Sequence, residues 1–204
     1  ILQLVDGKWE KGKTRTGTAS LLRDVIEAAQ KKILEFINEK NPDLENKEII
    51  AREIGVSAIT FNDLKNSRLK DVKFDWDAVM SFEGDTGPYV QNAHVRLCSI
   101  MRKAGYAVKL DEVDYAQLQD DNAYELIKVL ARKGEKILAA CNTDEPSVLA
   151  QYALEIAEYA HRFIHNDRVL GSAEEKSRLF LVQATQIVLE NVLDLLGLFP
   201  IRQM

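Results

Sequence analysis

Apolar residues recur every three or four positions through most of this chain, and this spacing constrains the fold more than any other feature. Because an α-helix completes a turn in about 3.6 residues, such spacing gathers apolar side chains on one helix face. The runs are Leu22, Val25, Ile26, Ala29, Ile33 and Ile37; Ile49, Ile50, Ile54, Ala58 and Ile59; Tyr89, Val90, Ala93, Leu97, Ile100 and Met101; Leu149, Tyr152, Ala153, Ile156, Ala157, Ala160 and Phe163; and Leu179, Val182, Ile187, Val188, Leu193 and Leu196. A further helix is expected over 122–141. The chain is therefore predicted to be mainly α.

Residues between these runs indicate where the helices start and stop. Asn41-Pro42 should end the first helix, since a residue before proline is pushed out of the α region. Asp144 is a candidate N-cap for the helix that follows it. The sequence of Ser172–Glu175 is that of a capping box, which would open the last helix, and Gly197 should close it.

Two short segments depart from the helical pattern. Ile1–Val5 is typical of the end of a strand, with a polar loop expected from Asp6 to Thr18. Val72–Asp77 is expected to be a short strand or an extended segment. Gly84–Pro88 would interrupt the chain before the third helical run, so a domain boundary is placed between 84 and 85. The second half is then a helical bundle.

Composition narrows the class of protein. Of 204 residues, 46% are hydrophobic and 29% charged, as in ordinary globular proteins. No apolar run approaches the roughly 20 residues that cross a bilayer, so no membrane partner and a cytoplasmic location are expected. The net charge of -5 disfavours a nucleic-acid partner without excluding one, because local patches can bind phosphates. Four cations gather around one predicted helix connection: Arg162, Arg168, Lys176 and Arg178.

Cysteine and histidine spacing favours no metal site. Cys98 and Cys141 lie far apart without a CxxC partner, so both are predicted to be core thiols. His161 and His165 have the i, i+4 spacing that could share a metal, but no third ligand lies nearby.

Residues 7–14 satisfy the phosphate-loop pattern GxxxxGK[ST] and follow a candidate strand. We reject this interpretation because Lys8–Lys11 are bulky where a phosphate cradle needs close backbone amides. Gly17 also interrupts the place where the helix should continue, and no alternation of strands and helices follows.

Residues 81–96 read Ser-Phe-Glu-Gly-Asp-Thr-Gly-Pro-Tyr-Val-Gln-Asn-Ala-His-Val-Arg, a sequence that packing alone does not require. This segment resembles the arginyl-tRNA synthetase family, departing at Asn92, where the family usually has Tyr, and at Val95, where small residues are commoner. Phe74–Asp77 also matches the family's F-D-W-D. The resemblance covers essentially the whole chain. It implies a helical remnant of a class I, Rossmann-type catalytic domain over 1–84 and an α-helical anticodon-binding bundle over 85–204.

The resemblance also implies an ATP site, because Lys11–Gly17, K-G-K-T-R-T-G, is similar to the family's degenerate KMSKS loop. Lys11, Lys13 and Arg15 would then assist catalysis and, with Thr14, bind the phosphates of ATP, with Mg²⁺ expected beside them. Cations on a closing loop can stabilise the charge that shifts onto pyrophosphate as an adenylate forms. From the residues alone, a solvated charged loop remains the alternative.

In the bundle, the resemblance implies contacts to tRNA(Arg). Phe163 and Met204 are the expected base contacts, and Arg168 and Arg178 the expected phosphate partners. Ile164 stands where the family usually has Tyr, and for each aromatic residue core packing is the alternative. Within the helix over 89–100, Tyr89, Gln91 and His94 cannot share one face, and His94 is expected to be a satisfied polar residue rather than a catalyst.

The implied function is arginine–tRNA ligation, in which arginine is activated with ATP and transferred to tRNA(Arg). The HIGH motif and its strands are missing, so the chain is expected to be a C-terminal fragment, a monomer, and unable to aminoacylate alone. It ends on Met204 as family members often do, so a natural C terminus is expected. The alternative is a non-catalytic RNA-binding or adaptor module with the same architecture.

Overall fold

The computed structural model describes residues 2–5, 8–11 and 21–204. Residues 2–5 and 8–11 form a small sheet with residues 73–74, in the strand order β2-β1-β3. Strand β1 (Leu2–Val5) pairs antiparallel with β2 (Lys8–Lys11) and parallel with β3 (Lys73–Phe74). The predicted strands at both places are confirmed, but the loop expected from Asp6 to Thr18 is wrong over Lys8–Lys11. Asp75 already caps the short helix α3 (Trp76–Val79) by accepting from the Asp77 and Ala78 amides, so the extended segment is shorter than expected.

A helical hairpin follows the sheet, formed by α1 (Leu22–Lys40) and α2 (Lys47–Leu64). Helix α1 ends at the residue before Asn41, as Asn41-Pro42 predicts. The two helices bury Ala29, Ile33 and Ile37 of α1 against Ile54 of α2. Of the residues predicted on apolar faces, Leu22, Ile49 and, on the last helix, Ile187 are exposed instead of buried.

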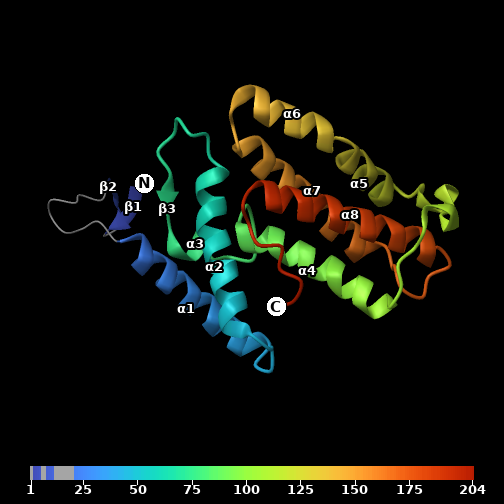
Figure 1. Cartoon of the computed structure of the whole chain (residues 1–204), viewed down its shortest axis with the longest axis horizontal. Coiled ribbons are helices and arrows are strands. Elements are labelled where there is room, and N and C mark those ends of the chain that lie inside the picture. The colour runs from blue at the N-terminus through green and yellow to red at the C-terminus, as the bar shows by residue number, and fades with distance from the viewer. Residues whose placement is uncertain (1, 6–7, 12–20) are drawn as a thin grey trace.

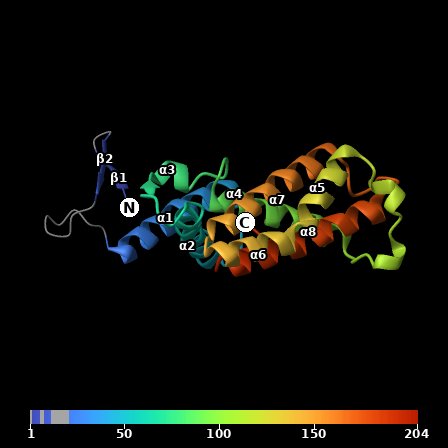
Figure 2. The same ribbon diagram turned by 90° about the horizontal axis from the view of Figure 1, so that it is seen from above.

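The rest of the chain is a bundle built from α4 (Gly87–Ala104), α5 (Asp121–Ala131), α6 (Lys133–Thr143), α7 (Ser147–Asn166) and α8 (Glu175–Leu195). Two short 3₁₀ turns, η2 (Leu110–Glu112) and η3 (Tyr115–Leu118), connect α4 to α5. Helices α4, α7 and α8 run side by side, and α5 and α6 cover α7 (Figures 1 and 2). A mainly α fold is therefore confirmed.

The helix expected over 122–141 is broken at Arg132 into α5 and α6. The hydroxyl of the buried Tyr152 donates to the carbonyl of Val129 at 3.0 Å, and the Arg132 amide donates to the same carbonyl at 3.2 Å. These two donors occupy the acceptor that a continuous helix would offer to the amide of Lys133. A side chain from α7 thus decides where α5 ends.

Two predicted helix starts are wrong. Asp144 does not cap α7: it lies in the left-handed region at φ 50° as the C-cap of α6, and α7 begins at Ser147. Ser172 does not form a capping box, because its hydroxyl donates back to the Val169 carbonyl at 3.1 Å. The end of the last helix is confirmed, since Gly197 takes φ 68° directly after it.

The buried residues form two cores. The bundle core gathers apolar residues of α4, α5, α7 and α8, and the hairpin core gathers those of α1, α2 and α3. Helix α4 contributes to both, with Leu97 in the bundle core and Val95 in the hairpin core. Cys98 is buried as expected, but Cys141 is exposed on α6, so only one of the two is a core thiol.

Candidate functional site

The 81–96 segment forms the start of α4 and the turn before it, and its residues explain how that helix begins. The Thr86 hydroxyl accepts from the Tyr89 amide at 3.1 Å and donates to the Ser81 carbonyl at 2.6 Å. Pro88 lies in the first turn, where a missing amide hydrogen costs nothing. At Gly87, a Cβ atom would lie 3.0 Å from the Ser57 carbonyl oxygen of α2. A larger residue would push α4 away from α2, so the segment sets the contact between bundle and hairpin.

Beyond this first turn, α4 presents Gln91 and His94 to the C-terminal residues of the chain. Both side chains are fully buried. Gln91 Nε2 donates to the Phe199 carbonyl at 2.8 Å, and His94 Nδ1 lies 2.7 Å from the Ile201 carbonyl. Tyr89 faces α7 instead, with its ring 5.0 Å from that of His161. As predicted, Tyr89, Gln91 and His94 do not all lie on one helix face, because Tyr89 faces α7. His94 is a satisfied buried histidine, also as predicted.

Burial lowers the pKa of His94, while the Ile201 carbonyl and the Glu190 carboxylate act in the opposite direction. Because a carbonyl only accepts, Nδ1 of His94 must carry the hydrogen. The neutral ring with Nδ1–H is the form that this site holds.

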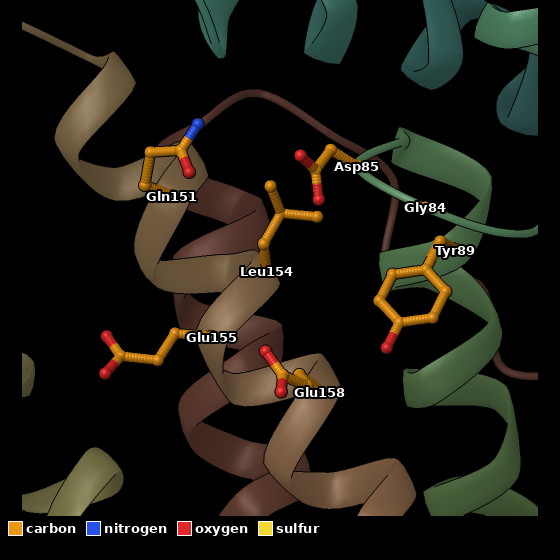
Figure 3. A pocket seen from close by; sticks show the side chains of 7 residues that line it. All are labelled: Gly84, Asp85, Tyr89, Gln151, Leu154, Glu155 and Glu158. Carbon is orange, nitrogen blue, oxygen red and sulfur yellow. The ribbon is translucent and has the colours of Figure 1, made fainter.

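A cleft of about 360 Å³ lies between the start of α4 and α7 (Figure 3). Its walls carry the carboxylates of Asp85, Glu155 and Glu158 beside the ring of Tyr89. No lysine or arginine is among its lining residues in the described part of the chain. Glu155 pairs with Arg132 at 2.9 Å and Glu158 with Arg162 at 2.8 Å, so part of this negative charge is compensated by cations outside the lining.

A second cleft, of about 530 Å³, has the opposite charge and lies between the last turns of α4, α8 and the C-terminal residues. Arg102 and Arg202 line it together with Tyr106, Met101 and Gln186. Arg102 donates to the Arg202 carbonyl at 2.7 Å, and Arg202 pairs with Glu190 at 2.8 Å. Cations beside an exposed aromatic ring suit a nucleic acid. Sequence reasoning missed this pair, because the two arginines lie 100 residues apart.

The residues predicted to bind tRNA have different surroundings. Phe163 is fully buried in the bundle core, so its ring offers no free face to a base and the core-packing alternative describes it here. Met204 is partly buried against the hairpin core. Arg168 is exposed, with Nε donating to the Leu170 carbonyl at 3.0 Å. Arg178 is 16% exposed, lies 3.3 Å from Glu174, and donates to the Arg168 carbonyl.

The other predicted cations are mostly paired. Arg162 lies 2.8 Å from Glu158 and stacks on Tyr159, and Lys176 lies 3.0 Å from Glu112. The predicted ATP residues Lys13, Thr14 and Arg15 lie outside the described residues, and of Lys11 only the backbone is described, at the end of β2. Their role therefore stays a prediction.

The described residues show no feature of a membrane protein or of a metal centre. No helix among them is long and apolar enough to span a bilayer. Within the same residues, no three His, Cys, Asp or Glu side chains come together as metal ligands.

Comparison with known proteins assigns the two halves. Residues 90–204 match the family described as DALR anticodon binding domain, and residues 2–76 match the catalytic domain of class I (R) tRNA synthetases. An arginine–tRNA ligase of Clostridium botulinum is 44% identical over 197 residues, which is 95% of this chain and 35% of that protein. One from Alkaliphilus metalliredigens is 42% identical over 188 residues.

Solved structures agree with this assignment. Thermus thermophilus arginyl-tRNA synthetase has a TM-score of 0.86 at 35% identity, covering 99% of this chain and 34% of that one. The Plasmodium falciparum enzyme has a TM-score of 0.76 at 26% identity, covering 89% and 32%. The chain thus spans about a third of the length of the relatives it matches. It belongs to the arginyl-tRNA synthetase family and matches its C-terminal portion, the end of the class I catalytic domain followed by the DALR anticodon-binding domain.

Proposed function

We propose that this chain is the part of an arginine–tRNA ligase that binds the anticodon arm of tRNA(Arg). The observation that carries the proposal is that residues 90–204, a compact helical bundle with its own core, match a family described as anticodon-binding. The family matches end at 76 and begin at 90, which supports a boundary at 84–85. The relatives are named for the whole ligase, and this chain covers about a third of them.

We also propose that the residues at the end of β2 and directly after it take part in the catalytic step. Lys11, Lys13, Thr14 and Arg15 would bind the ATP phosphates, with Mg²⁺ alongside, while arginine is activated. The match of residues 2–76 to the class I catalytic domain supports this assignment. The loop would supply positive charge where pyrophosphate leaves.

For tRNA binding, the surroundings of three of the four predicted residues rank them. Arg168 is exposed and keeps guanidinium hydrogens free for a phosphate beyond its bond to Leu170. Arg178 is held by carboxylates on two sides, at 3.3 Å from Glu174 and 3.7 Å from Asp120, so we propose that it shapes the turn carrying Arg168. Phe163 would contact a base only after leaving the core.

The test is binding of the chain to an arginine tRNA transcript and to a non-cognate tRNA of similar size, across a salt series. We expect tighter binding to the arginine transcript. Replacing Arg168 in the variant Arg168→Gln should lower the salt slope by about one, since one phosphate contact is lost. Lys128→Gln, at an exposed lysine paired with Glu125 on α5, is the matched control and should leave the slope unchanged. Equal binding to both tRNAs would contradict the proposal.

A further inference from the structure

The last six residues, Phe199–Met204, form a strap without helix or strand that contacts both the bundle and the hairpin. Leu198, just before the strap, is 3% exposed in the bundle core. Three residues later, Ile201 is 4% exposed in the hairpin core. Figure 1 shows this end of the chain beside α4, on the side of the α1–α2 hairpin. The strap therefore belongs to both cores and is anchored at its middle.

Hydrogen bonds from α4 hold the strap at three successive points. Gln91 Nε2 donates to the Phe199 carbonyl, His94 Nδ1 to the Ile201 carbonyl, and Arg102 to the Arg202 carbonyl, at 2.7–2.8 Å. The first two donors are fully buried. The bond to Ile201 is buried, so leaving that carbonyl unpaired would be costly, whereas the Phe199 carbonyl also accepts from the Ile201 amide at 3.0 Å.

The hairpin holds the strap from the other side. The Phe199 amide donates to the Ser57 hydroxyl of α2 at 3.2 Å. Asn41, at the end of α1, donates to the Met204 carbonyl at 3.4 Å. The strap is thus bonded to the hairpin at Phe199 and Met204, and to α4 at Phe199, Ile201 and Arg202.

The strap forms part of the surfaces assigned to RNA. Arg202 and Gln203 line the cationic cleft, and Met204 is a predicted base contact. Glu190 of α8 holds the Arg202 guanidinium at 2.8 Å, and its other carboxylate oxygen lies 3.8 Å from His94 Nε2. The Arg202 side chain is therefore placed both by its own bond to Glu190 and by the hydrogen bonds that hold the strap backbone.

We propose that Gln91 and His94 are positioning residues for tRNA binding, which hold the Phe199–Met204 strap so that Arg202 and Met204 face the RNA. This inference rests on the proposed function. It also gives a role to two buried polar residues in the middle of the 81–96 segment.

The test uses the whole chain and four variants. Gln91→Met and His94→Leu keep side-chain volume and remove the donors to the strap. His94→Asn places an amide nitrogen near the position of Nδ1 and should restore the bond to Ile201. Thr185→Val serves as the control, because it removes another buried hydroxyl whose hydrogen bond goes to the Leu181 carbonyl within α8.

Two readouts separate positioning from folding. The first is hydrogen exchange of the strap amides, which we expect to speed up in Gln91→Met and His94→Leu while the amides of α7 stay protected. The second is binding to the arginine tRNA transcript and to the same transcript with its anticodon bases changed. We expect the two variants to lose roughly tenfold for the first RNA and little for the second. His94→Asn should recover most of the loss, and Thr185→Val should match the parent.

Unchanged strap exchange in both variants would overturn the proposal, and so would an equal loss for both RNAs or a loss of the same size in Thr185→Val. If the parent chain itself does not distinguish the two RNAs, the proposed function fails. Faster strap exchange would then still establish what holds the strap, and the assignment to tRNA binding would be refuted.

Discussion

Replacing Gly87 by alanine tests how closely α4 must approach α2. The new Cβ would lie 3.0 Å from the Ser57 carbonyl oxygen, 3.0 Å from Phe61 Cβ and 3.1 Å from Ala58 Cα. These atoms are backbone or directly attached to it, so the helices themselves must move apart. Overpacking of this kind costs about 1–3 kcal/mol, and little is returned by helix propensity because Gly87 is the first residue of α4. We expect Gly87→Ala to destabilise the chain by about 1–2 kcal/mol.

Gly134→Ala is the matched control, since Gly134 also lies in a helix but nothing lies within 4 Å of its added Cβ. That variant should gain up to about 1 kcal/mol from helix propensity. Urea unfolding followed by circular dichroism measures both changes. At a slope of about 2 kcal/mol per molar urea, Gly87→Ala should lower the midpoint by roughly 0.5–1 M. A Gly87→Ala variant as stable as the parent, beside a stabilised Gly134→Ala, would refute the reasoning.

Three further predictions concern buried polar groups. Tyr152→Phe should cost about 1 kcal/mol in urea unfolding, because the Val129 carbonyl loses one of two donors; no loss would mean that the hydroxyl does not set the end of α5. Thr86→Val should cost about 1–2 kcal/mol, because it removes the hydroxyl that caps the start of α4. A loss below about 0.3 kcal/mol would contradict this capping role. Burial and the charge of Arg96 lower the pKa of His161 from 6.5 to about 4, so the unfolded chain binds more protons between these values and stability should fall as pH drops through this window. Urea unfolding of the parent and of His161→Gln at about pH 7 and 4.5 checks this pH effect, and an identical fall in both would refute it.

Local pattern was enough to predict the helices and most of their buried faces. The apolar face of α7, from Leu149 to Phe163, is buried throughout, because the spacing of apolar residues alone decides which side of a helix can enter a core. The end of α1 at Asn41-Pro42 was predicted for a similar reason, since proline restricts its neighbour through local geometry.

Features that depend on a distant partner were not predicted. The break at Arg132 requires the Tyr152 hydroxyl, which comes from another helix. Cys98 and Cys141 both lie on helices, yet Cys98 is buried where α4 meets α8 and the strap, while Cys141 is exposed on α6. The candidate helix starts at Asp144 and Ser172 failed because each polar side chain found a different local conformation or acceptor.

The candidate site likewise has features that the sequence predicts and features that depend on distant contacts. The resemblance in residues 81–96 identified the family, as the comparisons confirm. The contacts of Gln91 and His94 join positions more than 100 residues apart, so no local pattern reveals them. The burial of Phe163 was foreseen only as the alternative to base stacking.

The central claim is that the helical half of this chain recognises the anticodon arm. Its most direct test is competition, in which labelled arginine tRNA bound to the chain is displaced by an isolated anticodon stem-loop or by an isolated acceptor hairpin of equal length. The account predicts that the anticodon stem-loop displaces the tRNA at far lower concentration. Displacement by both hairpins at the same concentration would mean that the chain binds RNA through charge alone, and would contradict the account.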